Sequence, residues 1–494
     1  MDTIFQINPL DNVAVCINKL PAGSMVFCGN QAVVVKNKIP AGHKISIQDI
    51  KRGEQIIKYG YPIGYAKEDI PLGSWVHTHN VQSNLGPILS YSYHPKFHEL
   101  KKQKPAFFSG YKRPNGKVGI RNEVWIIPTV GCVNSLARQV EQMAQKYKTK
   151  NIDGIYAYNH PYGCSQLGGD QQRTLQALCG LIRHPNAAAV LVISLGCENN
   201  NIDKFKQVLG NYDKQRVRFL VCQEYSDELR AADAVMEELC QYADQSKREL
   251  VPASKLVVGL KCGGSDGFSG ITANPVVGAF SDLLIAQGGT TIMTEVPEMF
   301  GAEQLLMNRC RNEKVFQKTV NLINDFKQYF KRYGEKINEN PSPGNKAGGI
   351  TTLEDKSLGC IQKGGRSPVE DVLSYGEPIS HTGFNLLQGP GNDLIATCAL
   401  AFSGASLILF TTGRGTPLGC PVPTVKISSN SHLAQFKKSW IDWNAGVVLE
   451  GATIQQTSDK LFRYVLRLAS GELHSHSESL DKHELAIFKD GVTL

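Results

Sequence analysis

The apolar run AAVLVISL (Ala188–Leu195) leads directly into the polar turn GCENN (Gly196–Asn200), and this junction decides the fold class of the 494-residue chain. A strand that is apolar on both faces belongs to a parallel sheet covered by helices. The pattern recurs as VWIIPTV, GIYAY, RFLVC, LVVGL, TTIM and SLILFTT, which begin at Val124, Gly154, Arg218, Leu256, Thr290 and Ser406. Segments with amphipathic helical spacing, such as Ser135–Lys148, separate the runs. The sequence therefore predicts α/β domains with mainly parallel sheets.

The first 90 residues have a different texture, because a short motif with a glycine between apolar positions recurs in them. It occurs as LPAGSMV, IPAGHKI, IKRGEQI and IPLGSWV, which begin at Leu20, Ile39, Ile50 and Ile70. Such a glycine is typical of a tight turn between short strands. We predict a multidomain protein with a small all-β N-terminal domain (1–90), a linker (91–110), an α/β second domain (111–252) and an α/β C-terminal domain (253–494).

Composition restricts the class of function. Hydrophobic residues make up 41% and charged residues 20% of the chain, as in a protein that folds throughout. No apolar stretch approaches the roughly 18 residues that cross a membrane, and Met1–Leu10 lacks a signal-peptide pattern, so we expect a cytoplasmic protein. The net charge of +8 favours an anionic small molecule as partner, and nothing indicates nucleic-acid binding. The sequence leaves a homo-oligomer open.

Ligands of open α/β sheets bind beyond the carboxyl ends of the strands, so the residues after each apolar run are candidates for chemistry. Cysteine recurs there beside glycine, as Cys132, Cys164, Cys197 and Cys262. Thiolates bind iron, zinc or an iron–sulfur cluster, which makes these four candidate metal ligands. The alternative is that small residues suit tight turns and that the cysteines are merely buried.

Two further pairs of residues are candidate metal ligands. His77 and His79 are two positions apart, and in a strand such residues face the same side and can share an ion. Glu295 and Glu298 follow the run at 290–293 and flank a proline, so a fixed loop can present them to a metal or to a proton. The alternatives are an edge strand with two exposed histidines and an acidic helix N-terminus.

Glycine-rich loops are plentiful, and their backbone amides can approach an anion such as a carboxylate. The loops GGSDG, PSPGNKAGG and GPGN begin at Gly263, Pro341 and Gly389, and none is a nucleotide-binding fingerprint. Lys346 and Arg414 can pair with a substrate carboxylate, although ordinary surface cations fit the same pattern. The candidate substrate-binding residues are Arg414, Gly264, Ser265, Asp266 and Asn345.

Longer motifs carry a family resemblance over essentially the whole chain. HPYGCSQLGGD, CGGSDGFSGITANPVVG, TEVPEMFGAEQLL and ENPSPGNKAGGITTLEDKSLG, from His160, Cys262, Thr294 and Glu339, resemble the altronate/galactarate dehydratase family. The N-terminal domain is similar to the SAF domain of that family. The resemblance implies an iron(II)-dependent hydro-lyase, with Mn²⁺ compatible, that converts D-altronate to 2-dehydro-3-deoxy-D-gluconate and water in hexuronate breakdown. ITTLEDKSLGC and ELAIFKDGVTL, from Ile350 and Glu484, are more similar to the altronate branch.

The implied reaction needs a base at C2, an acid for the hydroxide that leaves C3, and a cation that stabilises the developing enediolate. We expect His77 and His79 to bind the metal with Glu295 or Glu298 as a further ligand. Arg414 and the GGSDG loop would hold the carboxylate. The candidates for proton transfer are Lys261, Lys346, His160 and Glu298.

Three alternatives stay open. The first is a lyase of galactarate or of a related acid such as sulfolactate, which product formation would distinguish. The second is a sugar-acid-binding protein without catalysis, which would bind substrate without iron-dependent turnover. The third is an iron–sulfur dehydratase that uses three strand-end cysteines, and its visible absorbance would reveal it.

Overall fold

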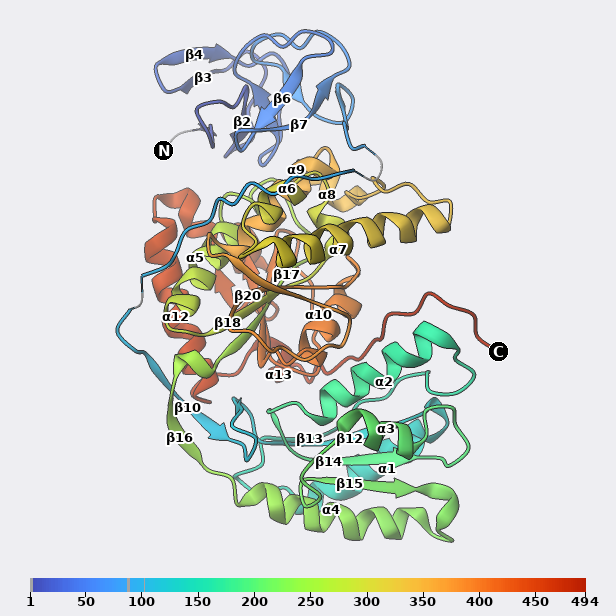
Figure 1. Cartoon of the computed structure of the whole chain (residues 1–494). Helices are drawn as coiled ribbons and strands as arrows, with labels where there is room; N and C mark the ends of the chain where they lie inside the picture. Colours follow the sequence, from blue (N-terminus) through green and yellow to red (C-terminus); the bar gives the residue numbers. More distant parts are fainter. Residues whose placement is uncertain (1–2, 87–88, 102) are drawn as a thin grey trace.

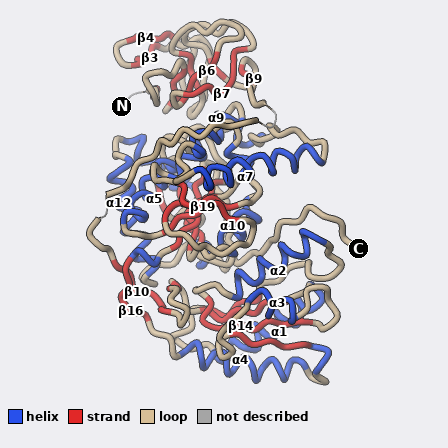
Figure 2. The backbone as a smooth tube through the Cα atoms, viewed as in Figure 1, coloured by secondary structure: helices blue, strands red, loops and turns tan. Residues whose placement is uncertain are grey.

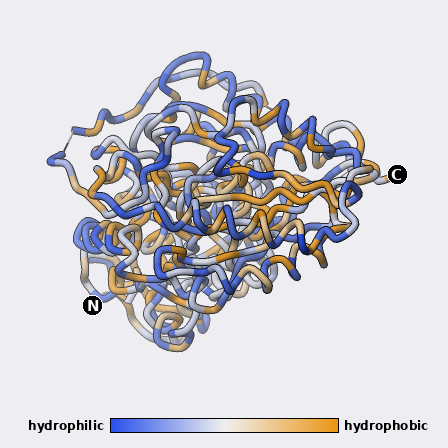
Figure 3. Tube along the Cα trace, turned by 90° about the horizontal axis from the view of Figure 1, so that it is seen from below, coloured by the Kyte–Doolittle hydropathy of each residue, from blue (hydrophilic) through white to orange (hydrophobic). Residues whose placement is uncertain are grey.

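The computed structural model describes residues 3–86, 89–101 and 103–494 and has three parts along the chain (Figure 1). An all-β N-terminal domain caps the C-terminal domain, and the second domain lies on the opposite side of the C-terminal domain (Figure 1). Strands and helices mostly alternate in the second and C-terminal domains (Figure 2). Seen from below, hydrophobic segments run through the middle of the molecule and hydrophilic ones dominate the outer loops (Figure 3). No helix within the described ranges is long and apolar enough to cross a membrane.

The N-terminal domain contains antiparallel strands, as predicted. One sheet has the order β1-β2-β5-β8, and the others are β3-β4 and β6-β7-β9. The glycines of the recurring motif all have φ between 81° and 86°, a conformation that a residue without Cβ adopts readily, so each forms a tight turn. The strands are Ile4–Phe5, Val13–Cys16, Met25–Cys28, Gln31–Val34, Lys44–Ser46, Gln55–Lys58, Tyr61–Ala66, Trp75–Val76 and Val81–Gln82 for β1 to β9.

The second domain is a parallel four-stranded sheet with the order β13-β12-β14-β15. Helices α1 (Asn134–Ala144) and α4 (Glu228–Asp244) pack on one face, and α2 (Gly168–Ile182) and α3 (Ile202–Leu209) on the other. Both faces are therefore buried, which explains the continuous apolar runs. The strands are Glu123–Pro128, Gly154–Ala157, Ala187–Ser194 and Val217–Val221 for β12 to β15.

A small antiparallel sheet joins the second and C-terminal domains. It has the order β11-β10-β16, formed by Val118–Gly119, Phe107–Lys112 and Arg248–Pro252. At the other side of the joint, the C-terminal segment crosses back to the second domain, where Thr493 pairs with Gln166 (Figure 1). The chain thus crosses between these two domains at both ends of the C-terminal domain.

The C-terminal domain is a parallel seven-stranded sheet with the order β19-β20-β18-β17-β21-β22-β23. The strands are Val257–Cys262, Thr290–Met293, Val369–Leu373, Gly383–Leu387, Leu407–Thr412, Thr424–Ser428 and Trp443–Asn444 for β17 to β23. The chain builds outward from β17 through β18 and then returns to β21 on the other side of β17. The carboxyl ends of β17 and β21 therefore form the switch point at which open α/β sheets bind ligands.

Helices cover both faces of this sheet and fix the neighbouring domains. Helices α5 (Ala273–Ala286) and α12 (Ile454–Ala469) pack together on one face, and α10 (Asp393–Phe402) packs between the other face and α2 of the second domain. The remaining helices are α6 (Glu303–Met307), α7 (Glu313–Arg332), α8 (Pro343–Ala347), α9 (Leu353–Cys360), α11 (Ser431–Phe436) and α13 (His476–Ser479). One hydrophobic core runs from the N-terminal domain into the C-terminal domain, so these two domains pack as one body.

Candidate active site

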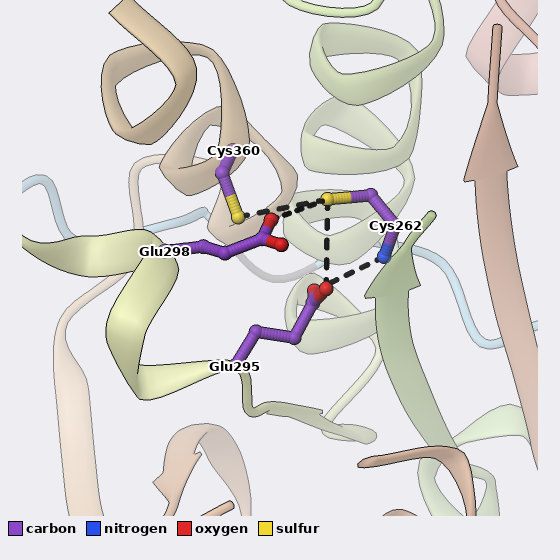
Figure 4. A group of neighbouring side chains, drawn as sticks. All are labelled: Cys262, Glu295, Glu298 and Cys360. Atoms are coloured by element: carbon purple, nitrogen blue, oxygen red, sulfur yellow. Dashed lines mark hydrogen bonds between the residues drawn. The ribbon is translucent and has the colours of Figure 1, made fainter. Parts of the chain in front are cut away.

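Four side chains converge at the carboxyl end of β17. Cys262 is the last residue of β17, Glu295 and Glu298 follow β18, and Cys360 ends α9. Their ligand atoms all lie within 4.8 Å of one another, and Figure 4 shows the side chains pointing toward one centre. We call these residues, together with the three lysines that contact them, the charged cluster. It lies at the switch point of the sheet.

Glu295 is held in a left-handed backbone conformation, with φ 71°. This conformation costs about 1–3 kcal/mol for a residue with a side chain, and it persists where the surroundings fix it. The carboxylate of Glu295 accepts a hydrogen bond from the backbone N–H of Cys262 (3.0 Å). It also pairs with the ammonium groups of Lys363 (2.8 Å) and Lys261, and all three side chains are fully buried. The strained loop therefore aims a carboxylate at two buried cations.

Glu298 forms the second ion pair of the charged cluster. Its carboxylate lies 2.8 Å from the ammonium of Lys356, and the thiol of Cys262 donates to it over 3.3 Å. Burial alone would raise the pKa of Glu298, but the charges of Lys356, Lys261 and Lys363 lower it to about 2. Glu298 is therefore an ionised carboxylate at neutral pH.

The buried lysines of the cluster stay protonated. Burial disfavours the charge of Lys261, yet Glu295 and Asp393 raise the pKa of its ammonium above the usual range. Glu298 has the same effect on Lys356. Three carboxylates, those of Glu295, Glu298 and Asp393, thus face the three ammonium groups of Lys261, Lys356 and Lys363. With neutral thiols these charges balance, and the three ammonium groups suit an anionic substrate and the extra negative charge of an enediolate.

The donor set of the cluster fits a divalent metal ion. Two thiols and two carboxylates are the ligands that iron(II) and zinc accept in a roughly tetrahedral site. The hydrogen bond to Cys360, together with burial, raises the pKa of Cys262 well above its usual value, so an ion would have to displace the thiol protons. Binding would therefore strengthen as pH rises.

A small cavity connects the cluster to the N-terminal domain. Its wall includes Lys58 and Tyr59 of the N-terminal domain and Asp266, Lys356 and Cys360 of the C-terminal domain. Lys356 is thus the lysine of the cluster that both pairs with Glu298 and lines this cavity, which has a volume of about 10 Å³. The cavity places the charged cluster beside the interface between the two domains.

Buried polar contacts hold this interface. The carboxylate of Asp355, on α9, lies 2.8 Å from the ammonium groups of both Lys44 and Lys58. The hydroxyl of Thr352 caps α9 by accepting from the backbone N–H of Asp355 (3.2 Å), and it donates to the carbonyl of Ile63 (2.5 Å). The helix that carries Lys356 and Cys360 is therefore anchored to the N-terminal domain.

The glycine-rich loops support the cluster. The amide of Asn345 donates to the carbonyl of Ser265 (2.8 Å), and its oxygen accepts from Lys356 (3.2 Å). Asp266 accepts from the hydroxyl groups of Ser269 (2.9 Å) and Ser429 (2.8 Å), which links the loops after β17 and β22. Of the predicted substrate-binding residues, these contacts bring Asn345 and Ser265 to the cluster, whereas Asp266 joins two loops beside it.

Arg414 lies at the edge of a larger groove, and Gly264 lies next to Arg414. Gly264 has φ 61°, and a Cβ on it would lie 3.6 Å from that of Arg414. Arg414 lines the groove, of about 660 Å³, with Phe268 and with Ala41 of the N-terminal domain. Lys346, on α8, is half-buried. The roles of Arg414, Gly264 and Lys346 stay predictions.

His77 and His79 do not lie in a strand, so that premise of the sequence analysis is wrong. Strand β8 ends at Val76, and the backbone N–H of Asn80 donates to the carbonyl of His77 (3.0 Å) to form a turn. Both imidazole rings contact Trp75, with centroid distances of 5.4 Å and 5.2 Å. Burial and the charge of Lys44 lower the pKa of His77 to about 3, and its buried Nδ1 has no hydrogen-bond partner.

The second-domain candidates lie apart from the charged cluster. Both ring nitrogens of His160 are engaged, with the carbonyl of Pro128 (2.8 Å) and the backbone N–H of Tyr162 (3.2 Å), and burial lowers its pKa to about 4. Cys132, Cys164 and Cys197 are exposed, and the ligand group around Cys262 does not include them. Of the four predicted cysteine ligands, Cys262 therefore lies in the charged cluster and the other three lie outside it.

Sequence reasoning missed Lys356, Cys360 and Lys363. All three fall in or beside ITTLEDKSLGC, which served only as a family marker. A signal was present, because this short segment combines charged residues with a cysteine next to glycine-rich loops. In the structure every residue of α9 is buried, and a buried helix rich in charge has to pair those charges.

Comparison with known proteins agrees with the arrangement of the domains. Residues 253–493 match the model of the D-galactarate/altronate dehydratase C-terminal domain. Residues 110–244 match the second domain of D-galactarate dehydratase/altronate hydrolase, and residues 2–84 match the altronate/galactarate dehydratase SAF domain. The chain belongs to the altronate/galactarate dehydratase family. The resemblance seen in the sequence is therefore confirmed, and the small all-β domain is its SAF domain.

Members of the altronate/galactarate dehydratase family resemble the chain along its full length. The chain is 51% identical to the altronate dehydratase of Bacillus subtilis (strain 168), over 100% of both chains. It is also 51% identical to the altronate dehydratase of Escherichia coli (strain K12), over 99% of both chains. Identity to the L-threo-forming galactarate dehydratase of Escherichia coli (strain K12) is 34%, over 98% of this chain and 96% of that protein.

Proposed function

We propose that the protein is a hydro-lyase that converts D-altronate to 2-dehydro-3-deoxy-D-gluconate and water. The observation that carries this proposal is the full-length identity of 51% to two altronate dehydratases, against 34% to a galactarate dehydratase. The charged cluster supplies the chemistry that such a reaction needs. The reaction removes the proton from C2 and hydroxide from C3, and the enol that remains becomes the 2-keto acid.

In the cluster, a carboxylate can accept the C2 proton and an ammonium group can protonate the leaving hydroxide. Glu298 is ionised and can accept the C2 proton, and Lys356 is protonated and can give a proton to the departing hydroxide. The ammonium groups of Lys261 and Lys363 stabilise the enediolate electrostatically, which is most effective where water is excluded. Lys261 therefore acts as a fixed cation in this proposal, since two carboxylates hold its proton.

A divalent ion completes the proposed site. Cys262, Cys360 and Glu295 would hold it, which leaves one position open for the substrate, as in catalytic metal sites. When bound, the ion supplies Lewis-acid polarisation of the substrate carboxylate. We infer iron(II) from the thiol donors. Mn²⁺ is the less favoured alternative, because manganese prefers oxygen ligands.

The choice between altronate and galactarate is tested by 2-keto acid release under anaerobic conditions with iron(II). We expect kcat/KM for D-altronate to exceed that for galactarate about 10²-fold or more, because a pocket built for the terminal hydroxyl rejects a second carboxylate that it leaves unpaired. A chelator-treated sample is the matched control for the metal, and iron(II) should restore its rate. Equal or faster turnover of galactarate would contradict the substrate proposal, and full activity after chelation would contradict the metal.

A further inference from the structure

Three exposed cysteines share one edge of the second domain. Cys132, Cys164 and Cys197 follow the carboxyl ends of β12, β13 and β14, and a glycine precedes each one. Of the thirteen cysteines, eight are buried and two are half-buried, so exposure is confined to these three. Free thiols at a surface are reactive, and proteins rarely leave them there without a use.

The turns that carry these cysteines interlock. The backbone N–H of Gly131 donates to the carbonyl of Tyr162 (2.9 Å), which joins the Cys132 turn to the Cys164 turn. A Cβ on Gly163 would overlap the carbonyl oxygen of Thr129 (2.0 Å). The backbone N–H of Asn200 donates to the carbonyl of Gly163 (3.3 Å), which joins the Cys197 turn as well. Three turns from separate segments, each with an exposed cysteine, are therefore brought together at one edge of the sheet.

The carboxylate next to Cys197 is already paired. Glu198, next to Cys197, accepts from the hydroxyl groups of Ser194 (2.5 Å) and Thr129 and from the backbone N–H of Gly196 (2.7 Å). The loop of Cys164 is pinned from outside, where Leu494 donates to the carbonyl of Ser165 (2.9 Å). The carboxylate is thus engaged in holding a turn. The thiols of Cys164 and Cys197 make only long contacts, with the Ser165 hydroxyl (3.8 Å) and the Gln223 amide (3.7 Å), so a ligand can displace these contacts.

The distances among the three thiols decide between a single metal ion and an iron–sulfur cluster. A single zinc or iron ion needs its ligand atoms within about 4 Å of one another. Within the described ranges, one group of possible metal ligands has its ligand atoms within 4.8 Å of one another, and that is the group around Cys262. It contains none of these three cysteines. An iron–sulfur cluster binds each thiolate through a different iron, so it spans thiols that stand further apart.

We propose that Cys132, Cys164 and Cys197 ligate an iron–sulfur cluster of the [4Fe–4S] type, whose fourth iron is open to a ligand from outside the chain. This centre is separate from the charged cluster of the C-terminal domain, and it does not depend on the proposed altronate dehydration. The proposal differs from the sequence-based prediction. That prediction grouped these cysteines with Cys262 and favoured a mononuclear ion over an iron–sulfur cluster.

Cys222 provides a matched control in the same sheet. It follows β15 directly, so it also stands at a strand end. Its side chain packs against the core under α1 and α4, and burial raises the pKa of its thiol to about 11. Cys222 is therefore expected to play no part in the cluster.

The test is the content of iron and acid-labile sulfide, with the visible absorption spectrum, in full-length protein purified without oxygen and reconstituted with iron(II) and sulfide. We expect roughly four irons and four sulfides per chain in the wild-type cluster, with any additional mononuclear iron carrying no sulfide. Cys132→Ala, Cys164→Ala and Cys197→Ala should each remove most of the sulfide and of the thiolate-to-iron absorption. Cys222→Ala should keep both, and melting curves check that every variant folds.

Several results would overturn the proposal. Wild-type protein that holds iron without sulfide, zinc in place of iron, or neither metal at this edge is incompatible with the cluster. The same holds if the three alanine variants keep the wild-type spectrum while folded. Sulfide and absorbance are measured without substrate. A missing cluster would therefore not contradict the proposed altronate dehydration, and a lack of altronate turnover would not contradict the cluster.

Discussion

A Lys356→Met variant is expected to lose about 10²–10³-fold in kcat for D-altronate, which corresponds to about 2.7–4 kcal/mol of transition-state stabilisation. Lys356 is the ammonium of the charged cluster that borders the cavity, and it pairs with Glu298 over 2.8 Å. Methionine keeps the length of the side chain and removes its charge and its protons. The measurement is steady-state 2-keto acid release with saturating D-altronate and iron(II).

Lys327→Met is the matched control for this prediction. Lys327 is also a buried lysine of the C-terminal domain, and it pairs with Glu303 over 2.8 Å. Loss of either ammonium leaves one buried carboxylate without that partner, so the two variants should lose similar stability. If Lys327→Met reduces kcat as much as Lys356→Met does at equal melting temperature, Lys356 has no special role in the reaction.

An Asp355→Asn variant is expected to weaken the docking of the SAF domain by about 3–5 kcal/mol, because it leaves two buried ammonium groups without their carboxylate. Lys44 and Lys58 are 0% and 2% exposed in their ion pairs with Asp355. The linker that follows the SAF domain should become sensitive to protease, and turnover should fall because Lys58 and Tyr59 leave the cavity wall. Limited proteolysis against denaturant concentration measures the change in docking.

Asp69→Asn is the control for the docking prediction. Asp69 pairs with Lys51 at the surface of the same domain, over 3.4 Å, with both side chains more than 60% exposed. Solvent screens an exposed ion pair, which therefore contributes little to stability, so this variant should digest like the wild type. Wild-type protection in Asp355→Asn itself would show that the hydrophobic contacts alone hold the SAF domain.

The same carboxylate predicts how docking depends on pH. Burial disfavours ionised Asp355, but Lys44 and Lys58 hold its pKa well below its usual value of 3.8. A carboxyl group whose pKa is depressed on folding contributes stability above its unfolded pKa and loses it as pH falls. Wild-type docking should therefore be complete above about pH 5 and should weaken as pH falls below about 4. Asp355→Asn should show a flatter pH profile in the same proteolysis assay.

The parallel sheets were predictable because their strands are buried on both faces and are therefore apolar at every position. The run before Gly196 is one example. The turns of the recurring motif were predictable as well, because a glycine between apolar positions, such as Gly42, marks each of them. Glu295 and Glu298 could be named as site residues because they directly follow such a strand. In each case the signal lies within a few consecutive residues.

The rest of the site depends on contacts that are distant in the sequence. Lys363 reaches Glu295 from a segment 68 residues away, and no local pattern encodes that approach. His77 was misplaced for a local reason, because the side chain of Asn80 accepts from its backbone N–H (2.9 Å) and stabilises a turn where an extended strand was expected. Asparagine is a typical residue for such turns, so this signal was present in the sequence.

The central claim is that the sugar acid reacts at the charged cluster beside the SAF domain. The most direct measurement is a crystal structure of the metal-free protein soaked with D-altronate. We expect density for the unreacted sugar acid, with its carboxylate within hydrogen-bond distance of Lys356 and its carbon chain facing Glu298. Density for the sugar acid at the edge of the second domain, with the charged cluster unchanged, would contradict the account.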